Sequence, residues 1–138
     1  MVFDTMVLAY ALLKTADFYE SSALAIDAAT EIWAPDSLRA EVVNVLWMSV
    51  RAGKVSPELA HEILQDLPKL VTHFVPTEVL WDQALDLAIA REHPAYDTLF
   101  IALAIQNRQK VITFDGPLMS KFPEWTLSVR DFLKTTTS

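Results

Sequence analysis

The sequence KVITFDGP, at residues 110–117, decides the fold class of this chain. Its β-branched and aromatic run ends at Asp115, and Gly116 and Pro117 then turn the chain out of a strand. Shorter apolar runs at 2–3, 31–34 and 73–75, and a weak one at 127–129, predict further strands. Helical patterns separate these runs. This alternation predicts an α/β fold, a three-layer α/β/α sandwich with a mainly parallel central sheet.

The segments between the strands carry apolar residues at helical spacing, bounded by capping residues, glycine and proline. The sequence predicts helices over residues 7–13, 20–29, 38–52, 58–67, 78–91 and 96–106, and a short one that ends at 122. We find no linker, repeat or low-complexity tract. Residues 1–134 are therefore expected to form one domain, followed by a frayed tail at 135–138.

Composition excludes several classes of protein. The 138 residues are 52% hydrophobic and include no cysteine, so disulfide frameworks and thiolate zinc sites are excluded. The net charge of −7 disfavours broad electrostatic binding of nucleic acid. No apolar stretch is long enough to cross a membrane, and the first residues do not resemble a signal peptide. We expect a cytoplasmic protein with no membrane segment. His61, His73 and His93 show no paired metal-ligand spacing.

Two acids follow predicted strands directly. Asp4 comes after the strand at 2–3, and Asp115 after the strand at 110–114. Ligands of open α/β sheets bind beyond the carboxyl ends of the strands, which is where these two side chains are expected. Aspartate is also a favoured N-cap of helices, so a purely structural role is the alternative for each.

Two more acids lie on the apolar faces of predicted helices. Glu41 shares the face of Leu38 and Val45, and Asp97 leads a stripe that includes Phe100 and Ile101. A carboxylate on such a face is costly unless a cation or hydrogen-bond donors meet it. For Asp97 the alternative is an acid favoured by the N-terminal end of the helix dipole.

Together the four acids form the oxygen-rich donor set that Mg²⁺ or Mn²⁺ prefers. Four polar side chains close to the acids in sequence are expected to support them with hydrogen bonds, although each is also an ordinary capping or sheet residue: Thr5, Asn44, Thr98 and Thr113. Bound Mg²⁺ or Mn²⁺ clamps phosphoryl oxygens during hydrolysis.

Four strings occur here in the order found in PIN domains: VFDT at 2–5, AEVVN at 40–44, YDTLFIALA at 96–104 and VITFD at 111–115. The chain resembles small PIN-domain ribonucleases of the VapC type, the toxins of toxin–antitoxin pairs, from residue 2 to about residue 129. The resemblance implies that Asp4, Glu41, Asp97 and Asp115 bind Mg²⁺ or Mn²⁺ for RNA cleavage. Met6 departs from the family, whose members often carry Asn or Ser there.

The resemblance also implies an RNA substrate, a cognate antitoxin protein and a homodimer. The helix at 58–67 and the region around Phe18 and Tyr19 are the expected contact regions. Lone basic residues are candidates for contacts with RNA phosphates: Arg39, Arg51, Lys54, Arg91 and Arg108.

The alternative function is a non-catalytic PIN-fold module that binds RNA or protein. A receiver domain needs paired acids after its first strand, and a dehalogenase-type phosphatase needs Asp where Met6 stands. The number of metal ions, one or two, stays open.

Overall fold

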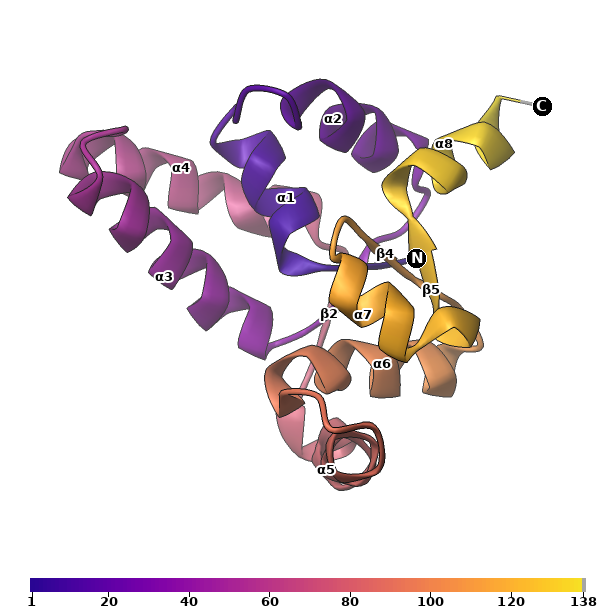
Figure 1. Cartoon of the computed structure of the whole chain (residues 1–138). Coiled ribbons are helices and arrows are strands. Elements are labelled where there is room, and N and C mark those ends of the chain that lie inside the picture. The colour runs from indigo at the N-terminus through magenta and orange to yellow at the C-terminus, as the bar shows by residue number, and fades with distance from the viewer. Residues whose placement is uncertain (138) are drawn as a thin grey trace.

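The computed structural model describes residues 1–137, and its five strands form one sheet (Figure 1). The sheet order is β3-β2-β1-β4-β5, and every neighbouring pair is parallel. The strands are β1 (Val2–Phe3), β2 (Trp33–Pro35), β3 (His73–Val75), β4 (Val111–Thr113) and β5 (Thr126–Ser128). Helices cover the sheet on both sides, which confirms the predicted α/β/α sandwich.

Seven α-helices and one 3₁₀ turn connect the strands within residues 1–137, and an eighth helix follows the last strand. The helix α6 packs against β1, β2 and β4, and α5 packs on α6. On the other side, α1 and α8 contact β4, with α2 lying between them, while α3 and α4 extend away from the sheet as a pair (Figure 1). The helices are α1 (Thr5–Leu12), α2 (Tyr19–Ala28), α3 (Ser37–Arg51), α4 (Pro57–Leu70), α5 (Thr77–Arg91), α6 (Ala95–Asn107), α7 (Gly116–Lys121) and α8 (Val129–Thr136), and the 3₁₀ turn is Pro123–Trp125.

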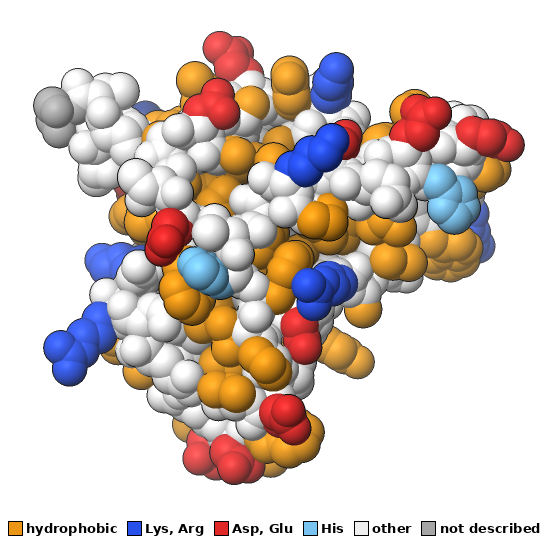
Figure 2. Space-filling view, turned by 180° about the vertical axis from the view of Figure 1, so that it is seen from behind, with side chains coloured by type: hydrophobic (Ala, Val, Ile, Leu, Met, Phe, Trp, Pro, Cys, Tyr) orange, Lys and Arg blue, Asp and Glu red, His pale blue; other side chains and the backbone are white. Residues whose placement is uncertain are grey.

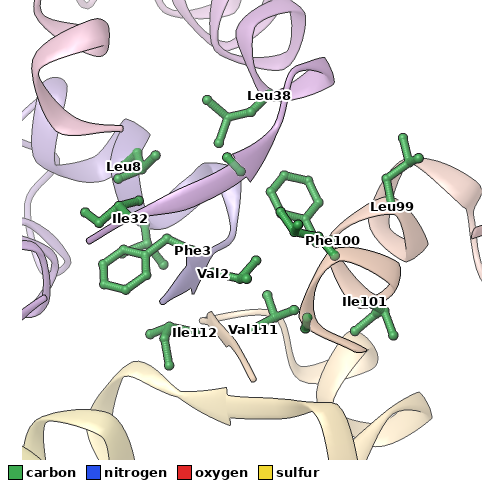
Figure 3. Packing of buried hydrophobic residues seen from close by; sticks show 14 of the residues in the cluster. Val2, Phe3, Leu8, Ile32, Leu38, Leu99, Phe100, Ile101, Val111 and Ile112 are labelled. Carbon is green, nitrogen blue, oxygen red and sulfur yellow. The ribbon is translucent and has the colours of Figure 1, made fainter. Parts of the chain in front are cut away.

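The core forms where α6 meets the central strands (Figure 3). Both residues of β1 are fully buried, as expected for a central strand of a parallel sheet that is covered on two faces. Residues 98–104 of α6 are buried without interruption, because the helix lies between the sheet and α5. Phe100 points toward β1 from this helix (Figure 3). This packing fixes the first turn of α6 relative to the ends of β1 and β4.

The C-terminal region differs from the sequence prediction. Thr135 and Thr136 belong to α8 rather than to a frayed tail, and Ser138 lies outside the described residues. Ser128 caps this helix by accepting a hydrogen bond from the backbone N–H of Asp131 at 3.0 Å. Phe132 packs edge-on against Phe3 at 6.0 Å between ring centroids. The helix therefore forms because it covers the core, and the expected tail from residue 135 is wrong for the residues described.

The sheet order places a topological switch point between β1 and β4. The chain builds outward from β1 to β2 and β3 on one side, and returns to place β4 and β5 on the other. This order differs from the 2-1-3-4-5 order of receiver domains, so the receiver alternative is excluded. Ligand sites in open α/β sheets lie at such a point, beyond the carboxyl ends of the strands. Among residues 1–137, no helix is long and apolar enough to cross a membrane.

Candidate active site

A cavity of about 540 Å³ opens at the switch point, and all four predicted acids line it. Two of the acids follow β1 and β4, and the other two come from α3 and the first turn of α6. Among the described residues, no lysine or arginine lines this cavity. The lining residues are Asp4, Thr5, Met6, Ser37, Ala40, Glu41, Asn44, Val45, Tyr96, Asp97 and Asp115.

Asp4 is the most firmly held of the four acids. Its side chain accepts a hydrogen bond from the backbone N–H of Thr5 at 2.8 Å and another from Thr113 Oγ1 at 2.7 Å. Burial raises the pKa of Asp4 to about 6, although both hydrogen bonds oppose the rise. The negative charges of Asp97 and Asp115 raise this pKa further, which shows that the three carboxylates share one electrostatic environment.

Glu41 enters the cavity from α3, and only one of its two carboxylate oxygens accepts a hydrogen bond. Thr5 Oγ1 donates a hydrogen bond to Glu41 Oε2 at 2.8 Å. Glu41 Oε1 is buried and has no hydrogen-bond partner within residues 1–137. Burial raises the pKa of Glu41 to about 7, and the charges of Asp4 and Asp97 add to the rise. A buried carboxylate oxygen without a donor is costly, and a bound cation would satisfy it.

Asp97 and Asp115 each have one hydrogen-bond donor. His93 Nε2 lies 2.8 Å from Asp97 Oδ2, and because the carboxylate accepts, the imidazole donates. Asp115 caps α7 by accepting from the backbone N–H of Leu118 at 3.1 Å. Its own backbone N–H donates to Thr113 Oγ1 at 2.9 Å. Thr113 therefore connects the two strand-end acids.

Two of the four expected supporting residues hydrogen-bond to the acids, and two do not. Thr5 and Thr113 do so as described. Asn44 lines the cavity, but its side-chain amide contacts Met48 Sδ at 3.7 Å. Thr98 is fully buried and donates to the carbonyl of Ala84 on α5 at 2.7 Å, so it joins α5 to α6 and does not support Asp97.

His93 is the residue that the sequence analysis missed. Its side chain is only 8% exposed and packs edge-on against Phe122 at 6.0 Å between ring centroids. This packing holds the imidazole where it contacts Asp97. The spacing of four residues between His93 and Asp97 was the available signal, but Pro94 separates them at the helix start, which hid their common face.

The donor set fits a hard divalent cation, although the side chains do not yet surround a common point. Among residues 1–137, no three acidic or histidine side chains come close enough together to form a finished metal site. Each carboxylate instead has a protein donor of its own. The described residues of the cavity supply four carboxylates and no lysine or arginine, and Glu41 Oε1 is buried there without a hydrogen-bond partner. Carboxylate oxygens are the ligands that Mg²⁺ and Mn²⁺ prefer.

Comparison with known proteins agrees with the geometry. Residues 1–121 match the sequence model of the PIN domain. This chain belongs to the PIN-domain family. The family resemblance inferred from the sequence motifs is therefore confirmed.

Two proteins of Pyrobaculum aerophilum are similar to this PIN domain. Ribonuclease VapC3 is 32% identical to it over 127 residues, which cover 89% of this chain and 95% of that protein. The crystal structure of PAE2754 superposes with a TM-score of 0.74 at 21% identity, covering 99% of this chain and 93% of that one. The second likeness concerns the fold alone.

Proposed function

We propose that this PIN domain is a metal-dependent endoribonuclease, the toxin of a toxin–antitoxin pair, which hydrolyses RNA phosphodiester bonds. One observation carries the proposal: four carboxylates, unaccompanied by any lysine or arginine among the described lining residues, meet in one cavity at the switch point of the sheet. Such a cluster is stable at neutral pH only with a cation or with protons. The similarity to Ribonuclease VapC3 supports the choice of RNA as substrate.

Asp4, Glu41, Asp97 and Asp115 would hold Mg²⁺ or Mn²⁺. A divalent ion supplies activation of water for attack and neutralisation of the charge that develops on the phosphate. Glu41 Oε1 is the oxygen that lacks a donor, and we assign it to the ion. The raised pKa of Glu41 means that its carboxyl group is partly protonated near neutral pH. Because metal ligands must be deprotonated, ion binding would release this proton.

The remaining polar residues orient the acids. Thr113 and the N–H of Thr5 hold both oxygens of Asp4, so this carboxylate keeps one orientation. His93 holds Oδ2 of Asp97 and leaves Oδ1 available to the cavity. We propose His93 as a positioning residue, comparable to the hydrogen-bond partners that orient metal ligands in other proteins.

Asp97→Asn tests the proposal at nearly constant shape. The purified parent should cleave RNA with Mg²⁺ or Mn²⁺ and stop when a chelator is added, and the variant should lose at least about 100-fold in cleavage rate. Excess Mn²⁺ should raise the Tm of the parent through preferential binding to the folded state, and should raise that of the variant distinctly less.

Asp86→Asn is the matched control, because it removes the same charge from an exposed position on α5. It should behave like the parent in both measurements. Equal Mn²⁺-induced shifts in the parent and in Asp97→Asn would contradict the metal site. A full shift without cleavage of total cellular RNA would favour a non-catalytic binding module instead.

We further propose that the protein acts in the cytoplasm, binds a cognate antitoxin and forms a homodimer. Phe18 stacks on Tyr10 at 4.3 Å between ring centroids and packs against Phe114, while its neighbour Tyr19 is 41% exposed. We keep this region and the helix at 58–67 as proposed contacts. Trp47 and Met48 on α3 are more than half exposed and offer an apolar surface. Light scattering that detects only monomer at micromolar concentration would contradict the dimer.

A further inference from the structure

A second cavity, of about 420 Å³, adjoins the acidic one and has the opposite charge. Met6 and Val45 line both cavities, so the two are neighbours along the groove between α1 and α3. Lys14 and Lys54 line the second cavity, and none of its described lining residues is acidic. The groove therefore changes from four carboxylates to two ammonium groups within one continuous surface.

The two lysines reach this cavity from different helices. Lys14 follows the end of α1, and Lys54 follows the end of α3. Neither forms a salt bridge among the described residues, in contrast to Lys69 and Lys134, which pair with Asp66 and Asp131. Hydroxyl-bearing residues also line the cavity: Tyr10, Thr15 and Ser49, of which Ser49 donates its hydroxyl to the carbonyl of Val45 at 3.0 Å. Ammonium and hydroxyl groups are donors that suit phosphate oxygens.

We propose that Lys14 and Lys54 bind a phosphate of the RNA backbone that lies several nucleotides away from the bond to be cleaved. This inference rests on the proposed nuclease function of the acidic cavity. Lys14 follows Asp4 by ten residues, most of them in α1, which corresponds to about 15 Å at 1.5 Å per helical residue. Lys14 is thus too far from Asp4 to touch the scissile phosphate, and we assign to the two lysines of this cavity the role of guiding the strand along the groove.

Two other basic side chains of this acidic protein have partners within the described part of the fold, unlike Lys14 and Lys54. The guanidinium of Arg39 lies over the ring of Phe74 at 3.7 Å, and Arg91 pairs with Glu124. On the face shown in Figure 2, lysine and arginine side chains stand apart and do not form a continuous basic stripe. RNA affinity would then depend strongly on the few cations placed along the groove.

Lysines near helix C-termini also interact favourably with the helix dipole, so the experiment must separate binding from stability. We suggest measuring the Kd of fluorescein-labelled single-stranded RNA by anisotropy over a range of salt concentrations. The protein would be the full chain carrying Asp97→Asn, to prevent cleavage. Lys14→Gln and Lys54→Gln are the test variants. Lys110→Gln is the control, because Lys110 precedes β4 and so lies at the opposite end of this strand from Asp115.

Each test variant should bind RNA several-fold more weakly and reduce the slope of log Kd against log salt by about 0.7, the value for one phosphate contact on a single strand. Lys110→Gln should show the same Kd and the same salt slope as the Asp97→Asn protein without a lysine substitution. Equal affinity and slope in all three variants, with RNA still bound, would overturn the phosphate site while leaving the nuclease proposal intact. Absence of RNA binding by the background and the control together would overturn both.

An acidic peptide is the competing occupant. If oligoglutamate of matched charge displaces RNA as efficiently as unlabelled RNA does, and does so less efficiently in Lys14→Gln and Lys54→Gln, the cavity belongs to an anionic protein segment. Displacement by RNA alone supports the phosphate assignment.

Discussion

The two acids at strand ends and the two acids on helices are held in different ways. Asp4 and Asp115 accept hydrogen bonds from backbone N–H groups and begin α1 and α7. Glu41 and Asp97 are held only by side chains, Thr5 in one case and His93 in the other. The strand-end acids are therefore part of the fold as well as of the cavity. The helix acids can be changed with little loss of structure.

The strongest test of this difference concerns His93. Replacing His93 by leucine keeps an apolar contact with Phe122 but removes the donor to Asp97. The Kd for Mn²⁺, measured from the free-ion signal in electron paramagnetic resonance, should rise by about 10- to 100-fold, as for other hydrogen-bond partners of metal ligands.

His93→Gln should restore most of the affinity, because the glutamine amide can donate from a position close to that of Nε2. If the leucine variant binds Mn²⁺ as tightly as the parent, His93 only packs against Phe122. If both variants are equally weak, the imidazole itself is required and the hydrogen bond is not the cause.

The second test uses the pH dependence of stability. The pKa of Glu41 is raised in the folded protein from 4.5 to about 7. The stability that this group contributes is thus complete below pH 4.5 and is lost as the pH rises through about 7. Glu41→Gln carries no charge, so with chelator present its free energy of unfolding at about pH 8 should exceed that of the parent by about 2 kcal/mol, a value that allows for solvent screening of the partly exposed Glu41.

The difference between Glu41→Gln and the parent should shrink as the pH falls from 7 to 4.5. Chemical denaturation at several pH values measures it. A constant difference across this range would show that the raised pKa of Glu41 is not its source.

The smallest expected effect separates capping from charge at Asp115. Asp115→Ala loses both the carboxylate and the cap of α7, whereas Asp115→Asn loses the charge and can still accept from Leu118 N–H. The alanine variant should be less stable than the asparagine variant by about 1 kcal/mol. Both should bind Mn²⁺ more weakly than the parent. Equal stability of the two variants would mean that Asp115 has no capping role.

The sequence predicted the four acids because each breaks a local rule that can be read without a structure. Asp4 and Asp115 interrupt apolar runs at strand ends, and Glu41 and Asp97 occupy apolar helix faces. Thr98 was assigned wrongly because sequence neighbours on a helix point about 100° apart. Its hydroxyl faces Ala84 on α5, and this orientation depends on how the two helices pack.

The C-terminal helix was also predictable in part. Ser128 followed by Asp131 is a helix-start pattern, and Val129 and Phe132 lie on one face. The three threonines and one serine at 135–138 disfavoured a helix there, since these residues have low helix propensity. Contact of Phe132 with Phe3 outweighs that propensity, and no local pattern reveals a partner at the other end of the chain.

The hydrogen bond between Thr113 and Asp4 joins residues 109 positions apart, and β1 pairs with β4 over a similar separation. Contacts between residues so far apart in the sequence form late in folding, because the entropy of closing the long chain segment between them must be overcome first. On the ribosome, the first strand emerges long before its partner, so the cavity cannot assemble until most of the chain has been synthesised. A nascent chain that ends before β4 therefore lacks Asp115 and the donor that Thr113 supplies to Asp4.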